Sequence, residues 1–145
     1  MREILFRAKR KNNGEWVEGG YHHQTDYYGD PCDNHYIVNG TQTDIEGYGE
    51  HYEIDPETIC QFTGIVDKKR KRIWENDIVS TNTYSHTNPG ELFGKVVYSE
   101  GWACWCIQLP DSKRLIPLCV YEGARQIDRA VKGNVFDDPE ILGRE

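Results

Sequence analysis

The chain has 145 residues, of which 37% are hydrophobic and 12% aromatic, and its formal net charge is −7. A chain of this length buries roughly 70% of its unfolded surface, which is enough for a core without disulfides or metals. The aromatic content excludes general disorder, and the absence of a long apolar run excludes a membrane-spanning helix. Because charged residues appear as early as Arg2 and Glu3, the start does not resemble a signal peptide, and we expect a cytoplasmic protein.

Positive and negative residues are separated along the chain. Residues 1–11 have a net charge of +4, residues 12–60 contain eleven acids and no Lys or Arg, and residues 61–82 have a net charge of +2. The acidic segment would repel a nucleic-acid backbone. It is either a solvated surface or a patch that docks a basic partner or mimics nucleic acid.

The cysteines do not indicate a disulfide framework. Five cysteines cannot all pair within one chain, and a cytoplasmic protein keeps its thiols reduced. Cys104 and Cys106 would share one face of a strand. Zinc ribbons use pairs of C-x-x-C knuckles instead, so we interpret the two cysteines as small buried hydrophobic residues.

Residues 1–60 are predicted to form an N-terminal β subdomain with long acidic loops. The Asn13-Gly14 dipeptide lies between two extended segments and predicts a hairpin with a type I′ turn. Its strands are expected over about 3–10 and 15–22. Residues 23–50 are rich in Gly, Asp, Asn, Tyr and Thr, so we expect long loops there with one short strand pair.

Two shorter features complete this part of the chain. The Gly19-Gly20 pair inside a predicted strand indicates a bulge or a close approach of another backbone. Asp55-Pro56-Glu57 has the order of an N-cap, a first helical residue and an acidic first turn, and predicts a single helical turn. Short extended segments are expected on either side of it, at 52–54 and 61–65.

Residues 61–145 are predicted to form a second, barrel-like β subdomain. A charged turn at 67–72 and a tight turn at 75–77 separate apolar segments. The strands expected after them are 94–98, 103–109, 114–118 and about 131–136. Short strands at this spacing are typical of a small barrel, and residues 138–142 predict a closing helical turn. No long 3.6-residue apolar period is present, so an α-helical bundle is excluded.

Four blocks of sequence carry a family resemblance. They are Arg2–Lys9 with Gly14–Val17, Asp55–Ile59 with Gln61–Gly64, Ile73–Val79, and Gly133–Glu140. In this order they resemble the YopX-like proteins of Gram-positive phages and prophages, and they span nearly the whole chain. The resemblance implies an all-β protein with an SH3-like barrel in its C-terminal half, a phage or prophage origin and oligomer formation. It implies no established biochemical activity.

The chain departs from the family pattern at two turns. Asn76 stands where such proteins commonly have Gly, and Asn is the non-Gly residue that best adopts a left-handed φ, so we expect the same turn. Residues 68–72 lack the Gly that such proteins commonly have there. The type of this second turn is therefore left open.

The same basic segment is the strongest nucleic-acid feature of the sequence. The candidate binding residues are Lys68, Lys69, Arg70, Lys71 and Arg72, followed by Trp74. The cations could contact phosphates while the Trp74 ring stacks on a base. One run of five cations on a chain of net charge −7 is a small footprint, however. We favour a solubilising hairpin tip, or a contact with the acidic segment of a neighbouring subunit.

Histidines and catalytic motifs are weaker features. The five histidines fall in segments predicted to be rich in loops. A metal site could in principle combine His22, His35 and His51 with Asp33 or Glu53, but the spacing matches no standard module, and surface histidines are expected instead. No phosphate-binding glycine loop, zincin or nucleophile-elbow motif is present, so we expect no catalytic residues, no metal and no cofactor.

Exposed tyrosines are the candidate partner surface. Aromatic residues in predicted strands are assigned to the core, whereas those in predicted loops are good interface anchors. These are Tyr27, Tyr28, Tyr48 and Tyr84.

The leading hypothesis is a non-enzymatic phage or prophage accessory protein in the cytoplasm of a bacterial host. It would assemble with itself and bind a host or phage protein, without contacting a membrane. The second hypothesis is a barrel that binds single-stranded nucleic acid, and the third is a metal-dependent enzyme.

Overall fold

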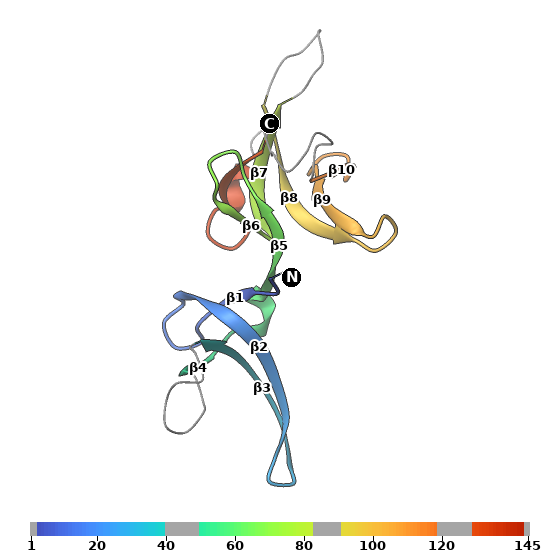
Figure 1. The fold of residues 1–145 in the computed structure, drawn as a ribbon. Coiled ribbons are helices and arrows are strands. Elements are labelled where there is room, and N and C mark those ends of the chain that lie inside the picture. Colours follow the sequence, from blue (N-terminus) through green and yellow to red (C-terminus); the bar gives the residue numbers. More distant parts are fainter. Residues whose placement is uncertain (1–2, 40–49, 83–90, 119–128, 144–145) are drawn as a thin grey trace. The chain divides into compact units, whose positions relative to one another are not determined.

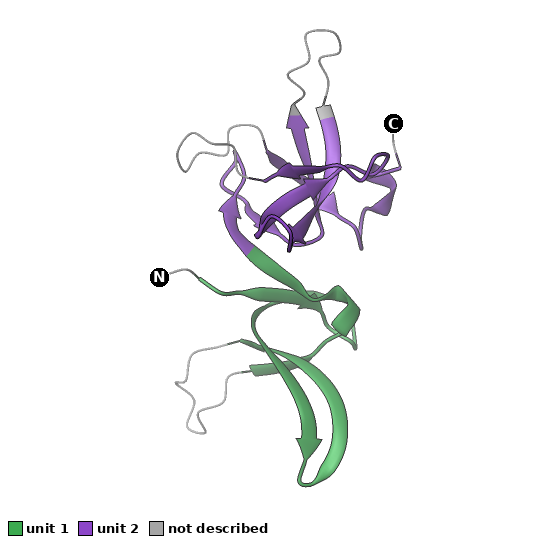
Figure 2. Ribbon diagram, turned by 90° about the vertical axis from the view of Figure 1, so that its right-hand side faces the viewer, with its two compact units in different colours: residues 1–62 green, residues 63–145 purple. Residues whose placement is uncertain are grey.

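Antiparallel strands make up almost all of the regular structure in the computed structural model of the chain (Figure 1). The structure describes residues 3–39, 50–82, 91–118 and 129–143. Within these ranges the only helical segments are two single 3₁₀ turns, which confirms the all-β prediction. Neither of these described turns has the length that a membrane-spanning helix needs. The chain divides into two units, residues 1–62 and 63–145 (Figure 2), and the sequence placed the boundary between residues 60 and 61.

Unit 1 is an antiparallel sheet in the order β4-β3-β2-β1-β5. Its elements are β1 (Phe6–Lys9), β2 (Trp16–Tyr27), β3 (Asp30–Asn39), β4 (Glu50–Glu53), the 3₁₀ turn η1 (Pro56–Thr58) and the start of β5 (Cys60–Val66). Ala8, Ile37 and Ile54 form its buried cluster. Half-buried Phe6, Val17, Tyr21 and Ile59 pack against that cluster, so the apolar core in the described part of this unit is small.

The β2–β3 hairpin corrects the prediction of long loops over residues 23–50. Strand β2 continues to Tyr27, and β3 returns from Asp30, with backbone pairing along the arm. The turn between them places Tyr28 and Gly29 at φ 49° and 88°, the signs that a two-residue type I′ turn requires. Polar side chains cover both faces of the arm, so the sequence lacks the apolar alternation that marks a strand. Residues 40–49 lie outside the described residues.

The first hairpin, between β1 and β2, has a different turn from the predicted type I′. Gly14 donates its N–H to the Arg10 carbonyl, and the Arg10 N–H donates to Glu15, both at 2.8 Å. Gly14 has φ 73°, but Asn13 is not left-handed, whereas a type I′ turn needs positive φ at both residues. The loop is therefore longer, with one left-handed glycine at its end.

Gly19 allows β3 to approach β2 closely, as the glycine pair predicted. A Cβ at Gly19 would lie 2.2 Å from the Val38 carbonyl oxygen, whereas a Cβ at Gly20 would lie 4.0 Å from it. Only the first of the two glycines is required by the backbone approach. The predicted cap of η1 is also confirmed, because the Asp55 side chain accepts a hydrogen bond from the Glu57 N–H and Pro56 opens the turn.

Unit 2 contains a sheet in the order β10-β9-β8-β7-β11 together with the paired strands β5 and β6. Its further elements are β6 (Arg72–Trp74), β7 (Asp77–Asn82), β8 (Glu91–Ser99), β9 (Cys104–Gln108), β10 (Leu115–Pro117), β11 (Ala130–Asn134) and the 3₁₀ turn η2 (Pro139–Ile141). The buried cluster is aliphatic and consists of Ile73, Val79, Val96, Ile107 and Leu118. The 3₁₀ turn η2 confirms the closing helical turn that the sequence predicted at 138–142.

The predicted SH3-like barrel stays a prediction. In the described part of unit 2, β10 and β11 are the two edges of an open sheet, and no ladder closes it.

The two departures from the family pattern are resolved at their turns. Asn76 has φ 66°, as expected, and in the basic segment Arg70 takes φ 66° without a glycine.

Candidate functional site

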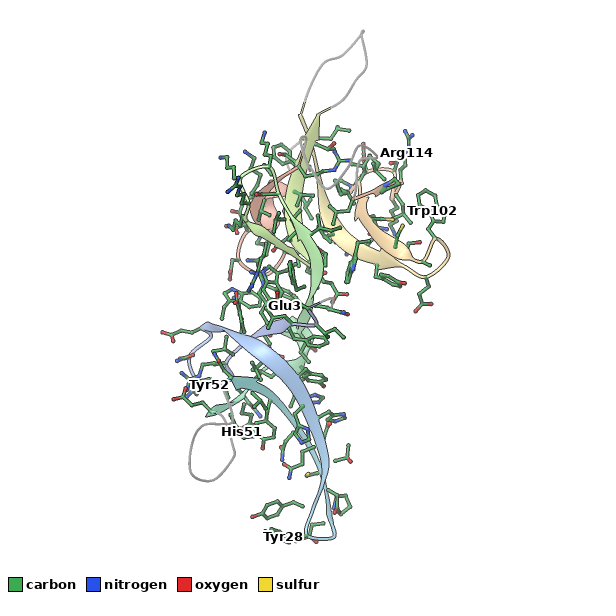
Figure 3. The ribbon with its side chains drawn as sticks, in the orientation of Figure 1. Glu3, Tyr28, His51, Tyr52, Trp102 and Arg114 are labelled. Atoms are coloured by element: carbon green, nitrogen blue, oxygen red, sulfur yellow. The ribbon has the colours of Figure 1, made fainter. Side chains whose placement is uncertain are left out.

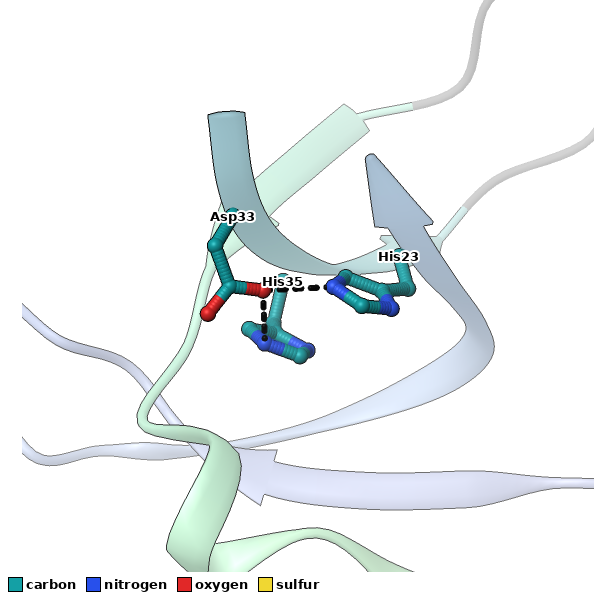
Figure 4. A group of neighbouring side chains, drawn as sticks. All are labelled: His23, Asp33 and His35. Atoms are coloured by element: carbon teal, nitrogen blue, oxygen red, sulfur yellow. Dashed lines mark hydrogen bonds and ion pairs between the residues drawn. The ribbon is translucent and has the colours of Figure 1, made fainter. Parts of the chain in front are cut away.

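A compact group of polar side chains lies on one face of the β2–β3 hairpin. His23 and His35 are directly opposite each other in the ladder, and Asp33 precedes His35 by two residues, which places all three on the same face. The Asp33 carboxylate Oδ1 lies 2.6 Å from His23 Nε2 and 3.1 Å from His35 Nε2 (Figure 4). The two imidazole rings are stacked with centroids 4.1 Å apart and an interplanar angle of 8°.

The group extends outward from the small core of unit 1. Ile37 is fully buried, whereas the side chains of His35, His23 and Asp33 are 15%, 40% and 78% exposed. Tyr21, which packs on the core, places its hydroxyl 2.5 Å from His35 Nδ1. The His35 carbonyl also accepts the Ile54 N–H at 3.0 Å. His35 is therefore the fixed member of the group, and Asp33 is the accessible one.

Local contacts set the charge state of two of these groups. The hydrogen bond from His23 is the main reason why the pKa of the Asp33 carboxyl lies below its usual value. Burial, with a smaller contribution from the Asp33 charge, raises the pKa of Tyr21 above its ordinary value. Asp33 is therefore an anion and Tyr21 a neutral phenol at neutral pH, so the group offers one carboxylate and two imidazoles on an open face.

This group differs from the predicted histidine site. Of the residues combined in that hypothesis, the structure brings together only His35 and Asp33, and it adds His23. His22 lies on the opposite face, stacked on Tyr36 at 6.5 Å, and Tyr36 in turn meets the edge of His51 at 6.4 Å. The sequence hypothesis missed His23 because residues 23–50 were predicted to be loop. If the hairpin register had been known, the D-x-H spacing of Asp33 and His35 opposite His23 would have identified the group.

Glu53, the other acid in that hypothesis, belongs to a separate feature. Its carboxylate pairs with the Lys11 ammonium at 3.3 Å, and the neighbouring Arg10 guanidinium lies over the Tyr52 ring at 4.6 Å. These residues line an open pocket together with Asn12 and His51. Because the acid and both cations in it already have partners within unit 1, the pocket offers little free charge to a ligand.

The tip of the β2–β3 hairpin carries two of the predicted interface tyrosines. Tyr27 is 60% exposed and Tyr28 is 91% exposed, and their rings meet edge to face at 4.7 Å. Figure 3 shows Tyr28 at the closed end of the hairpin. A bulky residue at positive φ is uncommon and costs about 1–2 kcal/mol. We call Tyr27 and Tyr28 the aromatic tip. Tyr48 and Tyr84 lie outside the described residues.

The predicted basic residues form an ordered, exposed turn. Buried Asp67 accepts hydrogen bonds from the Lys69 and Lys71 N–H groups at 2.8 Å, and its second oxygen accepts from Val131 at 3.0 Å. We call residues 68–72 the basic turn, and all five of its residues are exposed. Trp74, by contrast, is 2% exposed. Its ring is therefore not placed to stack on a base beside this turn.

The C-x-C cysteines lie side by side on β9, as the strand prediction required. Their sulfur atoms are 3.8 Å apart, with Cys106 fully buried and Cys104 partly buried. Burial, followed by the neighbouring Cys104, raises the pKa of Cys106 to about 11. Cys106 is therefore a neutral thiol at physiological pH, which supports its interpretation as a packing residue.

Comparison with known proteins adds a family and a fold. A family model described as "YopX protein" matches residues 5–143. No curated protein matches the chain. The crystal structure of protein EF1440 from Enterococcus faecalis has a TM-score of 0.54 and 21% sequence identity, covering 98% of this chain and 99% of that chain. At this level of identity the likeness concerns the fold alone.

Proposed function

Because the chain belongs to the YopX family, whose description names no activity, we propose a function from the surface of the chain itself. The resemblance of its four sequence blocks to this family is thereby confirmed. In this proposal the protein is non-enzymatic, assembles with copies of itself and binds a protein partner through the aromatic tip. Its phage origin stays a prediction from the resemblance, and its place in the host cytoplasm stays a prediction from the sequence.

The observation that carries this proposal is Tyr28, which is 91% exposed at φ 49°. Asn, Asp or Gly would satisfy this turn without the strain that a tyrosine brings. Strained residues persist where they serve a function, and exposed tyrosines are frequent anchors of protein interfaces. Tyr27 beside it, which is 60% exposed, adds to the aromatic area that a partner could bury.

Charge supports self-assembly as the second part of the proposal. The arm formed by β2 and β3 contains no Lys or Arg, and its acids Glu18, Asp26, Asp30 and Asp33 are exposed. The basic turn of unit 2 is exposed as well. Opposite charges on different parts of one chain favour head-to-tail contacts between copies. The proposed contact therefore joins the basic turn of one copy to the acidic arm of the next.

The experiment for the partner uses the double variant Y27S/Y28N, because Asn accepts the left-handed turn that Tyr28 occupies. Bait protein captures partners from a host lysate after nuclease treatment, and the captured proteins are quantified. We expect the variant to lose at least about tenfold of the captured partner, as removal of interface anchors does. Y98S is the matched control, because Tyr98 is also exposed, at 48%, but packs on Trp105 in unit 2. Equal capture by Y27S/Y28N and the unchanged protein would contradict the proposal.

The experiment for self-assembly is light scattering after size exclusion, at low and high salt. We expect K68E/K69E to reduce the molar mass of the assembly, and 0.5 M salt to do the same, because exposed charge contacts are screened. K113E/R114E is the control, since it reverses two exposed charges elsewhere in unit 2. A molar mass that is the same for all three proteins would exclude assembly through the basic turn.

Binding of single-stranded nucleic acid remains the second candidate. The exposure of the basic turn favours it, whereas the burial of Trp74 removes the proposed stacking platform. Fluorescence anisotropy with a labelled oligonucleotide tests it directly. Affinity that falls steeply with salt and is lost in K68E/K69E would move this candidate to first place.

A further inference from the structure

We propose that His23, Asp33 and His35 form a binding site for one divalent transition-metal ion, with Zn²⁺ as the best fit. Two imidazoles and one carboxylate are the ligand types of zinc sites that keep a position open for water. This inference is separate from the proposed partner binding at the aromatic tip, because it concerns the face of the β2–β3 hairpin, and it shares Asp33 with the proposed self-assembly contact.

The distances support the site. Zinc bonds to nitrogen and oxygen are about 2.0–2.1 Å long, so two ligand atoms of a tetrahedral ion lie roughly 3.3 Å apart. In the structure Asp33 Oδ1 lies 2.6 Å and 3.1 Å from the two imidazole Nε2 atoms. All three ligand atoms lie within 4.8 Å of one another. Shifts of around 1 Å would therefore be enough for the three atoms to surround an ion.

The surroundings of His35 provide the support that metal ligands usually have. An imidazole that binds a metal through one nitrogen commonly donates a hydrogen bond through the other, which fixes the ring. His35 Nδ1 faces the Tyr21 hydroxyl at 2.5 Å, so Nε2 is the nitrogen left for an ion. Tyr21 is itself packed on the core cluster of unit 1. The partial exposure of His23 and the exposure of Asp33 leave the site open to solvent on the other side.

The position of the site predicts what an ion would do. His23 and His35 are cross-strand neighbours, and the ladder is irregular between Gln24 and Asp26, just beyond them. One ion held by both strands would lock the register immediately before this irregularity. We therefore expect metal binding to reduce motion of the outer part of the arm, up to the aromatic tip.

The test titrates tag-free, chelator-treated protein with ZnCl₂ and follows binding by calorimetry. We expect one Zn²⁺ per chain, and an affinity at least about tenfold lower in D33N, which is isosteric and lies at an exposed position. H23Q should lower the affinity for Zn²⁺ by at least as much as D33N does. H22Q is the matched control, since His22 is the adjacent histidine on the opposite face, and its affinity should equal that of the unchanged protein. Y21F should weaken binding by about tenfold without changing the stoichiometry.

Two further measurements test whether Zn²⁺ binds at this group or elsewhere on the chain. When one equivalent of Zn²⁺ is added to the unchanged protein, the Hε1 resonances of His23 and His35 should shift. The Hε1 resonance of His22 should not. The C104S/C106S variant tests whether Zn²⁺ binds instead to these two cysteines, whose sulfur atoms are 3.8 Å apart. Loss of binding in this variant, or equal binding in D33N and the unchanged protein, would overturn the proposal. Light scattering of the same samples shows separately whether self-assembly occurs, so the two proposals fail independently.

Discussion

Among the described residues, unit 2 buries a cluster of five aliphatic side chains, whereas the buried cluster of unit 1 has three residues and includes an alanine. The hairpin arm of unit 1 places tyrosine, histidine and aspartate where further apolar residues would otherwise enlarge a core. Backbone pairing and stacked rings stabilise that arm in place of apolar burial. The comparison shows that the described part of unit 2 has the larger aliphatic cluster, while the arm of unit 1 exposes polar side chains.

The largest expected effect comes from the core of unit 2. Ile107→Ala should lower the free energy of unfolding by roughly 2–5 kcal/mol, because its fully buried neighbours cannot close the cavity. Ile37→Ala in unit 1 should fall at the lower end of that range, since half-buried neighbours can collapse around it. Urea denaturation followed by NMR of residues in each unit measures both. An equal or larger loss in Ile37→Ala would break the distinction between the two units.

Two carboxylates sharpen the same distinction. Asp67 of unit 2 is buried and accepts three backbone hydrogen bonds, so Asp67→Ala should cost about 2–3 kcal/mol of stability. Asp33→Asn in unit 1 should leave the free energy of unfolding nearly unchanged, because Asp33 is exposed. Thermal denaturation in metal-free buffer compares them. A marked destabilisation by Asp33→Asn would assign that residue a structural role.

The sequence predicted the parts of the fold that have strong local signals. The cap formed by Asp55, Pro56 and Glu57 and the left-handed Asn76 follow from the conformational preferences of single residues. The apolar strands of unit 2 follow from short hydrophobic segments between turns. In these places local preference and tertiary structure agree.

The candidate site could not be predicted in the same way. Its residues come from a hairpin whose two faces are both polar, so period-two alternation of apolar residues is absent. Tyr28 and Arg70 occupy left-handed positions that propensity assigns to Gly or Asn. The site depends on the register that pairs His23 with His35, and register is a property of the folded hairpin.

A pair of adjacent glycines tests how closely the two strands of the arm must approach each other. Gly19→Ala should lower the free energy of unfolding by roughly 1–3 kcal/mol, because the new methyl group would overlap the Val38 carbonyl. Gly20→Ala should be nearly neutral, since its methyl group would meet that oxygen only at 4.0 Å. Chemical denaturation of both variants, with His23 and Tyr21 resonances as local probes, measures the difference. Equal stabilities would mean that β3 can move away from β2 at little cost.

The smallest effect concerns reactivity rather than stability. With a pKa of about 11, Cys106 should have roughly one thousandth of its thiol ionised at pH 8, and its burial blocks reagents as well. Iodoacetamide should therefore label Cys106 far more slowly than Cys32, which is partly exposed on the arm of unit 1. Peptide mass spectrometry over a time course gives both rates from one sample. Because only native packing protects Cys106, labelling in urea should make the two rates similar, and fast native labelling would show that the core of unit 2 opens readily.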